Sequence, residues 1–257
     1  MGDLRYCFEK GYVARTLGIT ASKGLAVVDL EGISQADVNK ALNRDVMIYG
    51  YINVGALEHG RPYFDEFKDL RIAEYAGWPG EWWVDVTSEA WQKHIINEAY
   101  ELKRRGAIGI YLDNCDIYYM CEEGFKEERT EMWKQKPNKD KVYRALRLLI
   151  ALIVQETGLV VMPNGGDTFV RRLFKDGYGY LIHTINQEGV LYTDNKPTPA
   201  ADKKYYKDYL KWAKKQGLYI RGIEYTKSSK DALIAQAWYK SHGYHCYISK
   251  HKNLCGD

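Results

Sequence analysis

Segments with helical periodicity alternate with short apolar runs along most of this chain. In five places a helical segment ends on a glycine, and an apolar run follows it at once. These glycines, at positions 106, 158, 177, 217 and 243, stand where the C-terminus of a helix favours a left-handed residue. The apolar runs are short and rich in β-branched or aromatic residues, which is typical of strands covered on both faces. The pattern predicts strands within 107–114, 159–164, 178–188, 218–226 and 244–249.

Three further apolar runs, at 25–30, 46–55 and 82–86, bring the number of predicted strands to eight. Alternating strands and helices favour a parallel sheet, and eight such units favour an α/β fold of the (β/α)8 TIM-barrel type. A doubly wound open sheet is the competing architecture, but the turn after the first run lacks the G-x-G-x-x-G signature typical of that fold. The chain shows no linker and no break in composition, so we predict a single domain over residues 1–257.

The connections between the predicted elements carry two further signals. Candidate N-caps stand at the starts of several helices: Ser34, Thr87 or Ser88, Thr168, and Ser228 or Ser229. Residues 114–137, after the fourth predicted strand, form a connection long enough to be an insertion. Connections of that length in a compact domain often carry function.

Composition narrows the classes of protein. An apolar fraction of 46% and a charged fraction of 28% in 257 residues are typical of a globular chain. The net charge of +3 falls short of the basic stripe of a nucleic-acid-binding protein, and no apolar run is long enough to span a membrane. We therefore expect neither a nucleic-acid partner nor a membrane partner, and we expect a monomer.

The N-terminus and the cysteines bear on where the protein works. The first ten residues lack the apolar core of a signal peptide. The sequence is compatible with a cytoplasmic protein, or with an extracellular one whose export signal was removed. The five cysteines are an odd number without a C-x-x-C spacing, which favours free thiols, although Cys115 and Cys121 could pair across a loop.

Polar residues gather at the ends of the predicted strands. In a barrel of this type the chemistry takes place at the C-terminal ends of the strands. The residues at or just after these ends include carboxylates, amides and a phenol: Asp29, Tyr51, Asn53, Asp85, Asp113, Asn114, Asn164, Glu188 and Glu224. The chain also has 22 tyrosines and 7 tryptophans. Such a ring indicates a carbohydrate cleft, because sugars offer hydroxyls to polar groups and CH faces to aromatic rings.

Two of these carboxylates form a candidate catalytic pair. Asp113 ends the fourth predicted strand and Glu188 the sixth, so they lie two strands apart around the barrel, near enough to flank one bond. Glycoside hydrolysis requires two such groups, one to protonate the leaving oxygen and one to attack the sugar or to activate water. A single strand-end acid is equally compatible with capping the next helix.

Two other functions stay open at this point. One is a metal-dependent barrel enzyme centred on Asp113 and Asp116, since these carboxylates and Asn114 are hard oxygen ligands suited to Mg²⁺ or Ca²⁺. The complete D-x-[DN]-x-[DN]-G loop is absent, however, and no H-x-H or H-E-x-x-H pair suggests zinc. We therefore expect no metal and no cofactor. The other is a barrel that binds oligosaccharide without cleaving it.

Four segments of the chain carry a resemblance to a known family. They are YINVGALEHGRPY (51–63), GWPGEWWVDV (77–86), GIYLDNCDIY (109–118) and INQE (185–188). In this order they resemble the endo-α-1,4-polygalactosaminidase family, glycoside hydrolase family 114, and its TM1410-like bacterial relatives. The match is most specific between residues 46 and 188, and the order of strands extends it to most of the chain.

The resemblance implies a TIM barrel that cleaves α-1,4-linked galactosamine-rich or related amino-sugar polysaccharide. It implies Asp113 as the nucleophile and Glu188 as the acid/base. Further residues would line the subsite that holds the sugar: Asp29, Tyr51, Asp85, Asn114, Asp116 and Asn164. A cationic, deacetylated amino sugar would account for an acid-rich cleft in a chain with a net positive charge. The family's N-terminal strand carries a clearer Trp/Tyr-Gln pattern than RYCFEK does here, so the resemblance makes no prediction for the first 24 residues.

Overall fold

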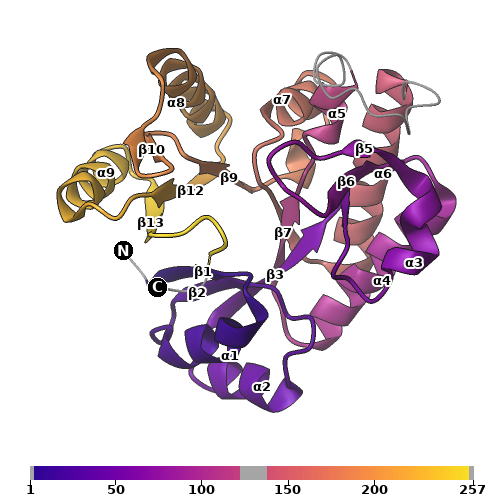
Figure 1. Ribbon diagram of the computed structural model, residues 1–257, viewed down its shortest axis with the longest axis horizontal. Coiled ribbons are helices and arrows are strands. Elements are labelled where there is room, and N and C mark those ends of the chain that lie inside the picture. Colours follow the sequence, from indigo (N-terminus) through magenta and orange to yellow (C-terminus); the bar gives the residue numbers. More distant parts are fainter. Residues whose placement is uncertain (1–2, 122–137, 255–257) are drawn as a thin grey trace.

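The computed structural model describes residues 3–121 and 138–254, and eight parallel strands flanked by helices form its centre (Figure 1). The strands, in chain order, are β1 (Leu4–Cys7), β2 (Leu25–Val28), β3 (Met47–Asn53), β7 (Gly109–Asp113), β8 (Val160–Pro163), β9 (Thr184–Glu188), β12 (Tyr219–Tyr225) and β13 (His245–Ser249). The longer helices are α1 (Lys10–Ile19), α2 (Gln35–Leu42), α4 (Glu89–Arg104), α6 (Lys139–Thr157), α7 (Asp167–Lys175), α8 (Ala200–Lys215) and α9 (Ser229–Ser241).

The eight strands are arranged as two parallel sheets. The first has the order β1-β2-β3-β7-β8, and the second has the order β9-β12-β13. Among the described residues, the junction between β8 and β9 is a parallel bridge from Asn164 to Asn186. At the opposite junction β1 and β13 lie in contact. The strands thus follow one another in the order of a (β/α)8 barrel, and the predicted fold class is confirmed.

Two of the strand assignments differ from the sequence prediction. The run 82–86 is not a barrel strand: β6 (Glu81–Val84) pairs antiparallel with β4 (Ala56–Glu58) and β5 (Arg71–Glu74), while β3 pairs directly with β7. The first barrel strand is instead β1, which pairs with β2. An aromatic run favours a strand without indicating its sheet, and β1 (LRYC) is not a continuous apolar run because Arg5 interrupts it. One strand is lost and one gained, so β7 stays fourth in the barrel and β9 sixth.

Apolar side chains form two cores on either side of the barrel wall. The larger core lies between the strands and the helices around them, and includes Trp83, Trp91 and Leu149. The smaller core fills the inside of the barrel and is rich in tyrosine: Tyr6, Tyr49, Tyr111, Tyr225 and Tyr247 belong to it. Tyrosine suits this position because its ring fills the interior while its hydroxyl reaches toward the polar end of the barrel.

The predicted helix ends are mostly confirmed. All five glycines after helices, at 106, 158, 177, 217 and 243, have positive φ angles. Ser34 and Ser228 are N-caps whose side chains accept a hydrogen bond from the backbone three residues on. Thr168 is not an N-cap, because α7 begins one residue earlier, after Gly166.

Shorter elements complete the chain around the strand ends. They are α3 (Phe64–Phe67), α5 (Ile117–Met120), the hairpin of β10 (Tyr192–Thr193) and β11 (Lys196–Pro197), and two 3-10 turns, Lys68–Leu70 and Gly179–Leu181. Of the predicted insertion, residues 114–121 are described and include α5, and residues 122–137 lie outside the described residues. Cys115 is a free thiol, so it does not pair with Cys121. None of the described helices combines the length and the apolar character needed to cross a membrane.

Candidate active site

Asp113 is the last residue of β7, and three hydrogen-bond donors lie within reach of its carboxylate. Asn114, which follows it, adopts the left-handed conformation with φ +63° and turns the chain away from the strand. The turn lets the backbone N–H of Asn114 donate to Asp113 Oδ1 at 3.0 Å. The Asn164 amide donates to the same oxygen at 3.0 Å, and the Tyr51 hydroxyl lies 3.2 Å from Oδ2. Asp113 is therefore held in one orientation at the end of the barrel.

Glu188 ends β9 and is held in a similar way by side chains alone. The hydroxyls of Tyr111 and Tyr225 donate to its Oε1 and Oε2 at 2.8 and 2.6 Å. The Asn164 amide donates to Oε1 at 2.8 Å. These donors come from three different strand ends, so Glu188 depends on the assembled barrel for its orientation.

One amide group joins the two acids. Asn164 Nδ2 donates to both Asp113 Oδ1 and Glu188 Oε1, while its own Oδ1 accepts from Asn186 Nδ2 at 2.7 Å. Bonds of 3.0 and 2.8 Å to one nitrogen place the two carboxylate oxygens no further apart than their sum, 5.8 Å. With both hydrogens of the amide pointing at their acceptors, the separation is about 5 Å.

Burial and repulsion shape the charge of this pair. Burial raises the pKa of Asp113 to about 7, and the neighbouring charge of Glu188 adds to the shift, while the hydrogen bond from Asn164 opposes it. A proton on Glu188 would remove that repulsion and lower the pKa of Asp113. The ionisation of Asp113 therefore depends on the charge of its neighbour Glu188.

Asp116 lies on the same turn as Asp113 and faces the loop after β8. Its two oxygens accept from the backbone N–H of Gly166, at 3.1 and 3.2 Å. Gly165 and Gly166 both have positive φ, and a Cβ at Gly165 would lie 3.0 Å from an oxygen of Asp116. Burial raises the pKa of Asp116 to about 6. Within residues 3–121 and 138–254, no group of three or more His, Cys, Asp or Glu side chains is placed to hold a metal ion.

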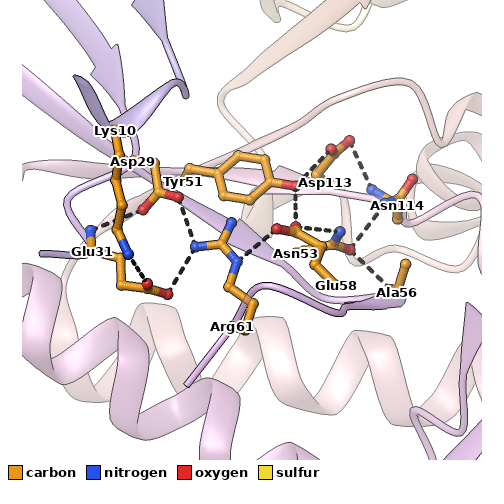
Figure 2. Close-up of polar contacts among 10 residues, drawn as sticks. All are labelled: Lys10, Asp29, Glu31, Tyr51, Asn53, Ala56, Glu58, Arg61, Asp113 and Asn114. Atoms are coloured by element: carbon orange, nitrogen blue, oxygen red, sulfur yellow. Dashed lines mark hydrogen bonds and ion pairs between the residues drawn. The ribbon is translucent and has the colours of Figure 1, made fainter. Parts of the chain in front are cut away.

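A second polar network reaches Asp113 from the other side of the site (Figure 2). Arg61 follows β4 and bonds three carboxylates, with Nε at 2.6 Å from Glu58 and Nη1 at 2.7 Å from Asp29 and 3.1 Å from Glu31. Burial alone would lower the pKa of Arg61, but the carboxylates of Glu58 and Asp29 outweigh it and raise the pKa. Arg61 is therefore a fixed cation inside a group of acids.

Glu58 connects this cation to Asp113 through Tyr51. Its Oε1 accepts from Asn53 Nδ2 and from the Tyr51 hydroxyl, each at 2.9 Å, and its Oε2 accepts from Arg61. Figure 2 shows Tyr51 lying between Glu58 and Asp113, with a contact to each. The phenol is thus the link between the two networks.

A cleft of about 660 Å³ opens over the strand ends. Asp113, Asn114, Asp116, Asn164 and Glu188 line it, and a smaller adjoining cavity of about 300 Å³ shares Asp113, Asn164 and Glu188 and adds Tyr51 and Glu58. Aromatic and acidic side chains supply much of the remaining wall of the cleft: Tyr75, Trp78, Tyr119, Tyr205, Tyr206, Asp167 and Asp202. The cleft combines carboxylates with flat apolar faces, as the sequence predicted for a sugar site.

Four of the sequence-predicted site residues do not line either cavity. Asp29 binds Arg61, and the amide of Asn53 is occupied by Glu58 and Asn114. Asp85 follows β6 and accepts from the backbone N–H and the hydroxyl of Thr87. Glu224 is fully buried and accepts from the N–H groups of Leu191 and Tyr192 and from the hydroxyl of Tyr239. These four side chains brace the site or its surroundings, and we do not include them among the proposed sugar contacts.

Several residues at the site are not among those predicted from the sequence, and three of them show why. Tyr225 faces the cleft while its neighbour Glu224 faces away, because successive residues of a strand point to opposite faces. Tyr111 precedes Asp113 by two residues and shares its face, so the strand period could have identified it. Glu81, at the start of β6, lines the smaller cavity, and burial together with the charges of Glu58 and Asp113 raises its pKa to about 8.

An eight-stranded α/β barrel with paired carboxyls at its C-terminal strand ends is the arrangement of barrel glycoside hydrolases. The chain belongs to glycoside hydrolase family GH114, whose profile matches residues 12–254. A curated relative, an uncharacterised protein of Deinococcus radiodurans, is 24% identical over 197 residues. That alignment covers 74% of this chain and 59% of the relative, so the chain spans about three fifths of the relative's length.

Solved structures share the fold over almost the whole chain. The glycoside hydrolase domain of PelA from Pseudomonas aeruginosa matches with a TM-score of 0.78 at 18% identity, over 98% of this chain and 96% of that one. Ega3 of Aspergillus fumigatus, in complex with galactosamine, matches with a TM-score of 0.71 at 15% identity, over 98% of this chain and 91% of that one. At these identities the likeness concerns the fold.

Proposed function

We propose that this chain is a retaining glycoside hydrolase that cleaves α-1,4-linked galactosamine-rich or related amino-sugar polysaccharide, with Asp113 as nucleophile and Glu188 as acid/base. The observation that carries the proposal is the Asn164 amide, which donates to both carboxylates and spaces them about 5 Å apart. Separations of about 5–5.5 Å are typical of retaining glycosidases, whereas inverting ones need roughly 6.5–9.5 Å to admit a water molecule.

The reaction would proceed in two displacements at the anomeric carbon. In the first, an oxygen of Asp113 forms a bond to that carbon, the glycosidic C–O bond breaks, and the proton of Glu188 goes to the leaving oxygen. In the second, Glu188 takes a proton from water, the water oxygen bonds to the anomeric carbon, and Asp113 leaves as a carboxylate. Each step consumes the protonation state that the other step restores.

The surroundings of the two acids support these roles. The hydrogen bonds from the N–H of Asn114 and the amide of Asn164 stabilise the Asp113 anion, both before attack and as it leaves, and the Tyr51 hydroxyl lies within reach of its second oxygen. The pKa of Asp113 is raised to about 7 by burial and by the charge of Glu188, so a protonated Glu188 favours an ionised Asp113. The first displacement needs the proton on Glu188 and the anion on Asp113.

The wall of the cleft supports an amino sugar as substrate. Asp116, Asp167 and Asp202 line it in addition to the catalytic pair, and a sugar ammonium group would be attracted to this negative charge. Exposed or half-exposed rings of Trp78, Tyr119 and Tyr205 offer stacking faces for the sugar rings. The membership of this chain in family GH114 also supports an amino sugar as substrate. So does the structural similarity to Ega3, whose structure was solved in complex with galactosamine.

The test is a reducing-end assay on a panel of amino-sugar polymers that differ in linkage and in acetylation. We expect the wild type to release reducing ends from deacetylated α-1,4-galactosamine polymer, and the variants Asp113→Asn and Glu188→Gln to release essentially none. An activated fluorinated galactosamine analogue should label Asp113, as located by the mass of the labelled peptide. Near wild-type rates for either variant, or a label on another residue, would overturn the assignment of roles.

A further inference from the structure

The Tyr51 hydroxyl has one hydrogen and two carboxylates within reach of it. Its oxygen lies 2.9 Å from Glu58 Oε1 and 3.2 Å from Asp113 Oδ2. Burial and the charges of Asp113 and Glu58 raise the pKa of Tyr51 well above its usual value, so the phenol keeps its proton. A phenol can donate only once, so Glu58 and Asp113 compete for the same hydrogen.

Glu58 is the fixed competitor in this pair. Arg61 bonds it at 2.6 Å, Asn53 bonds it at 2.9 Å, and Arg61 is itself held by Asp29 and Glu31. The side chain of Arg61 is only 13% exposed, so its positive charge is poorly screened by water. These contacts hold the Glu58 side chain in one place, whatever happens at Asp113.

Asp113 is the variable competitor in the proposed reaction. As a free carboxylate it attracts the Tyr51 hydrogen about as well as Glu58 does, because both are anions at similar distances. In the glycosyl-enzyme, Asp113 is an ester without charge and becomes the weaker acceptor. When the ester breaks, negative charge returns to Asp113 and makes it a strong acceptor again. The acceptor of the Tyr51 hydrogen should therefore follow the charge of the nucleophile.

We infer that Glu58 is a positioning residue that acts through Tyr51, holding the phenol hydrogen while Asp113 is bonded to the sugar and releasing it to Asp113 as that bond breaks. The inference rests on the proposed function, because it needs a covalent intermediate on Asp113. Tyr51 then serves the second displacement, and Glu58 keeps it from binding Asp113 so firmly that the first displacement is slowed.

Other titratable groups also act on Asp113, and the experiment must separate their effects from that of Glu58. Those that face it from the surrounding elements are Glu188, Asp116, Glu81, Tyr75, Tyr111, Tyr225 and, in the shared cavity, Lys252. Glu58 also repels Asp113 directly through space. A double-mutant cycle isolates the part of the Glu58 effect that passes through Tyr51.

The variants are Tyr51→Phe, Glu58→Gln and the double variant. Two quantities are measured for each. The first is the pH at which kcat/KM falls on the acidic side of its pH profile, called the acidic limb, and the second is the pre-steady-state rate of deglycosylation. Tyr51→Phe should move the acidic limb up by about one pH unit and slow deglycosylation about tenfold, because the Asp113 anion loses a donor. Glu58→Gln should move the limb down and should not slow deglycosylation, because the hydrogen then stays with Asp113. In the Tyr51→Phe background, the shift caused by Glu58→Gln should fall to less than half.

Two control variants match these changes in kind. Tyr49→Phe removes a hydroxyl from the same face of β3, and no hydrogen bond among the described residues joins that hydroxyl to Glu58, Asp113 or Glu188. Glu98→Gln removes a half-buried carboxylate that interacts electrostatically with Arg61 but does not line the cleft. Both should leave the limb and the deglycosylation rate within a factor of about two. Thermal melts of all variants check folding, and if Glu58→Gln fails to fold, Glu58→Asp replaces it.

Three outcomes would overturn the inference. An equal shift from Glu58→Gln with and without the Tyr51 hydroxyl would mean that Glu58 acts on Asp113 through space alone. A rise of KM with unchanged kcat and unchanged pH limb in Tyr51→Phe would make Tyr51 a sugar contact only. An unchanged deglycosylation rate in Tyr51→Phe would mean that the hydrogen does not follow the nucleophile. All three require a wild type that turns over through a labelled Asp113, so failure of the proposed function is recognised separately.

Discussion

Asp113→Asn should stabilise the folded protein at alkaline pH while it abolishes activity. The side chain keeps its shape, and its neighbours accept an amide: the oxygen can still accept from Asn164 and from the N–H of Asn114. The new NH₂ group would face the Tyr51 hydroxyl, which can accept it while donating its own proton to Glu58. Each polar atom at the position therefore keeps a partner.

The size of the effect follows from the pKa of Asp113, which is raised from its usual 3.8 to about 7, chiefly by burial. An acid with a raised pKa binds its proton more tightly in the folded state, so the folded protein loses stability as the pH rises from about 4 through about 7. At 1.36 kcal/mol per pKa unit, the cost is about 4 kcal/mol above pH 7 and about 1.5 kcal/mol near pH 5. Asparagine carries no charge and removes this cost, so these figures are upper limits for the gain.

The measurement is urea unfolding of wild type and variant at about pH 5 and about pH 8. We expect the free energy of unfolding of Asp113→Asn to exceed that of the wild type by up to about 4 kcal/mol at the higher pH, and by clearly less at the lower. Asp85→Asn is the matched control, because an amide oxygen at that position can keep both bonds from Thr87. An equal gain at both pH values, or a loss at the higher one, would refute the reasoning.

Three further variants test the contacts around the pair. Asn164→Ala removes a donor from both carboxylates, and we expect kcat/KM to fall about a hundredfold and its acidic limb to move to higher pH, as a pH-rate profile would show. Tyr225→Phe removes the 2.6 Å bond to Glu188, and stopped-flow measurements should show a slower first displacement by about tenfold. Glu224→Ala leaves two buried N–H groups without an acceptor, and calorimetry should show a melting temperature lower by several degrees with the pH profile unchanged.

The fold was predictable from the sequence where a local rule applied. The left-handed glycines mark the ends of five helices, because few other residues adopt that conformation cheaply, and each is followed by a barrel strand. The β1 strand escaped prediction because Arg5 interrupts its apolar run, whereas the equally short β2 is apolar throughout. The run at 82–86 misled because its aromatic residues form a strand in a three-stranded antiparallel sheet, and pairing partners are not a local property.

In the candidate site, too, some features follow from a simple rule of the fold and others depend on tertiary pairing. The proximity of Asp113 and Glu188 was predictable because a barrel places the ends of its strands together, wherever they lie in the sequence. Asp29, Asn53 and Glu224 stand at strand ends as well, but they are bonded to Arg61, Asn114 and backbone N–H groups. Which of two neighbouring residues faces the cleft depends on strand register, as Glu224 and Tyr225 illustrate, and register is fixed by tertiary pairing.

The junction of the two sheets sets the spacing of the two acids in this barrel. Asp113 belongs to the five-stranded sheet and Glu188 to the three-stranded sheet, and the sheets meet through the Asn164–Asn186 bridge beside the two acids. The distance between the two acids therefore depends on how the two sheets meet, and not on the geometry within either sheet. A shift of about 1.5 Å at this joint would carry the gap from the retaining range into the inverting range. Substitutions at this junction would thus change the gap without altering Asp113 or Glu188 themselves.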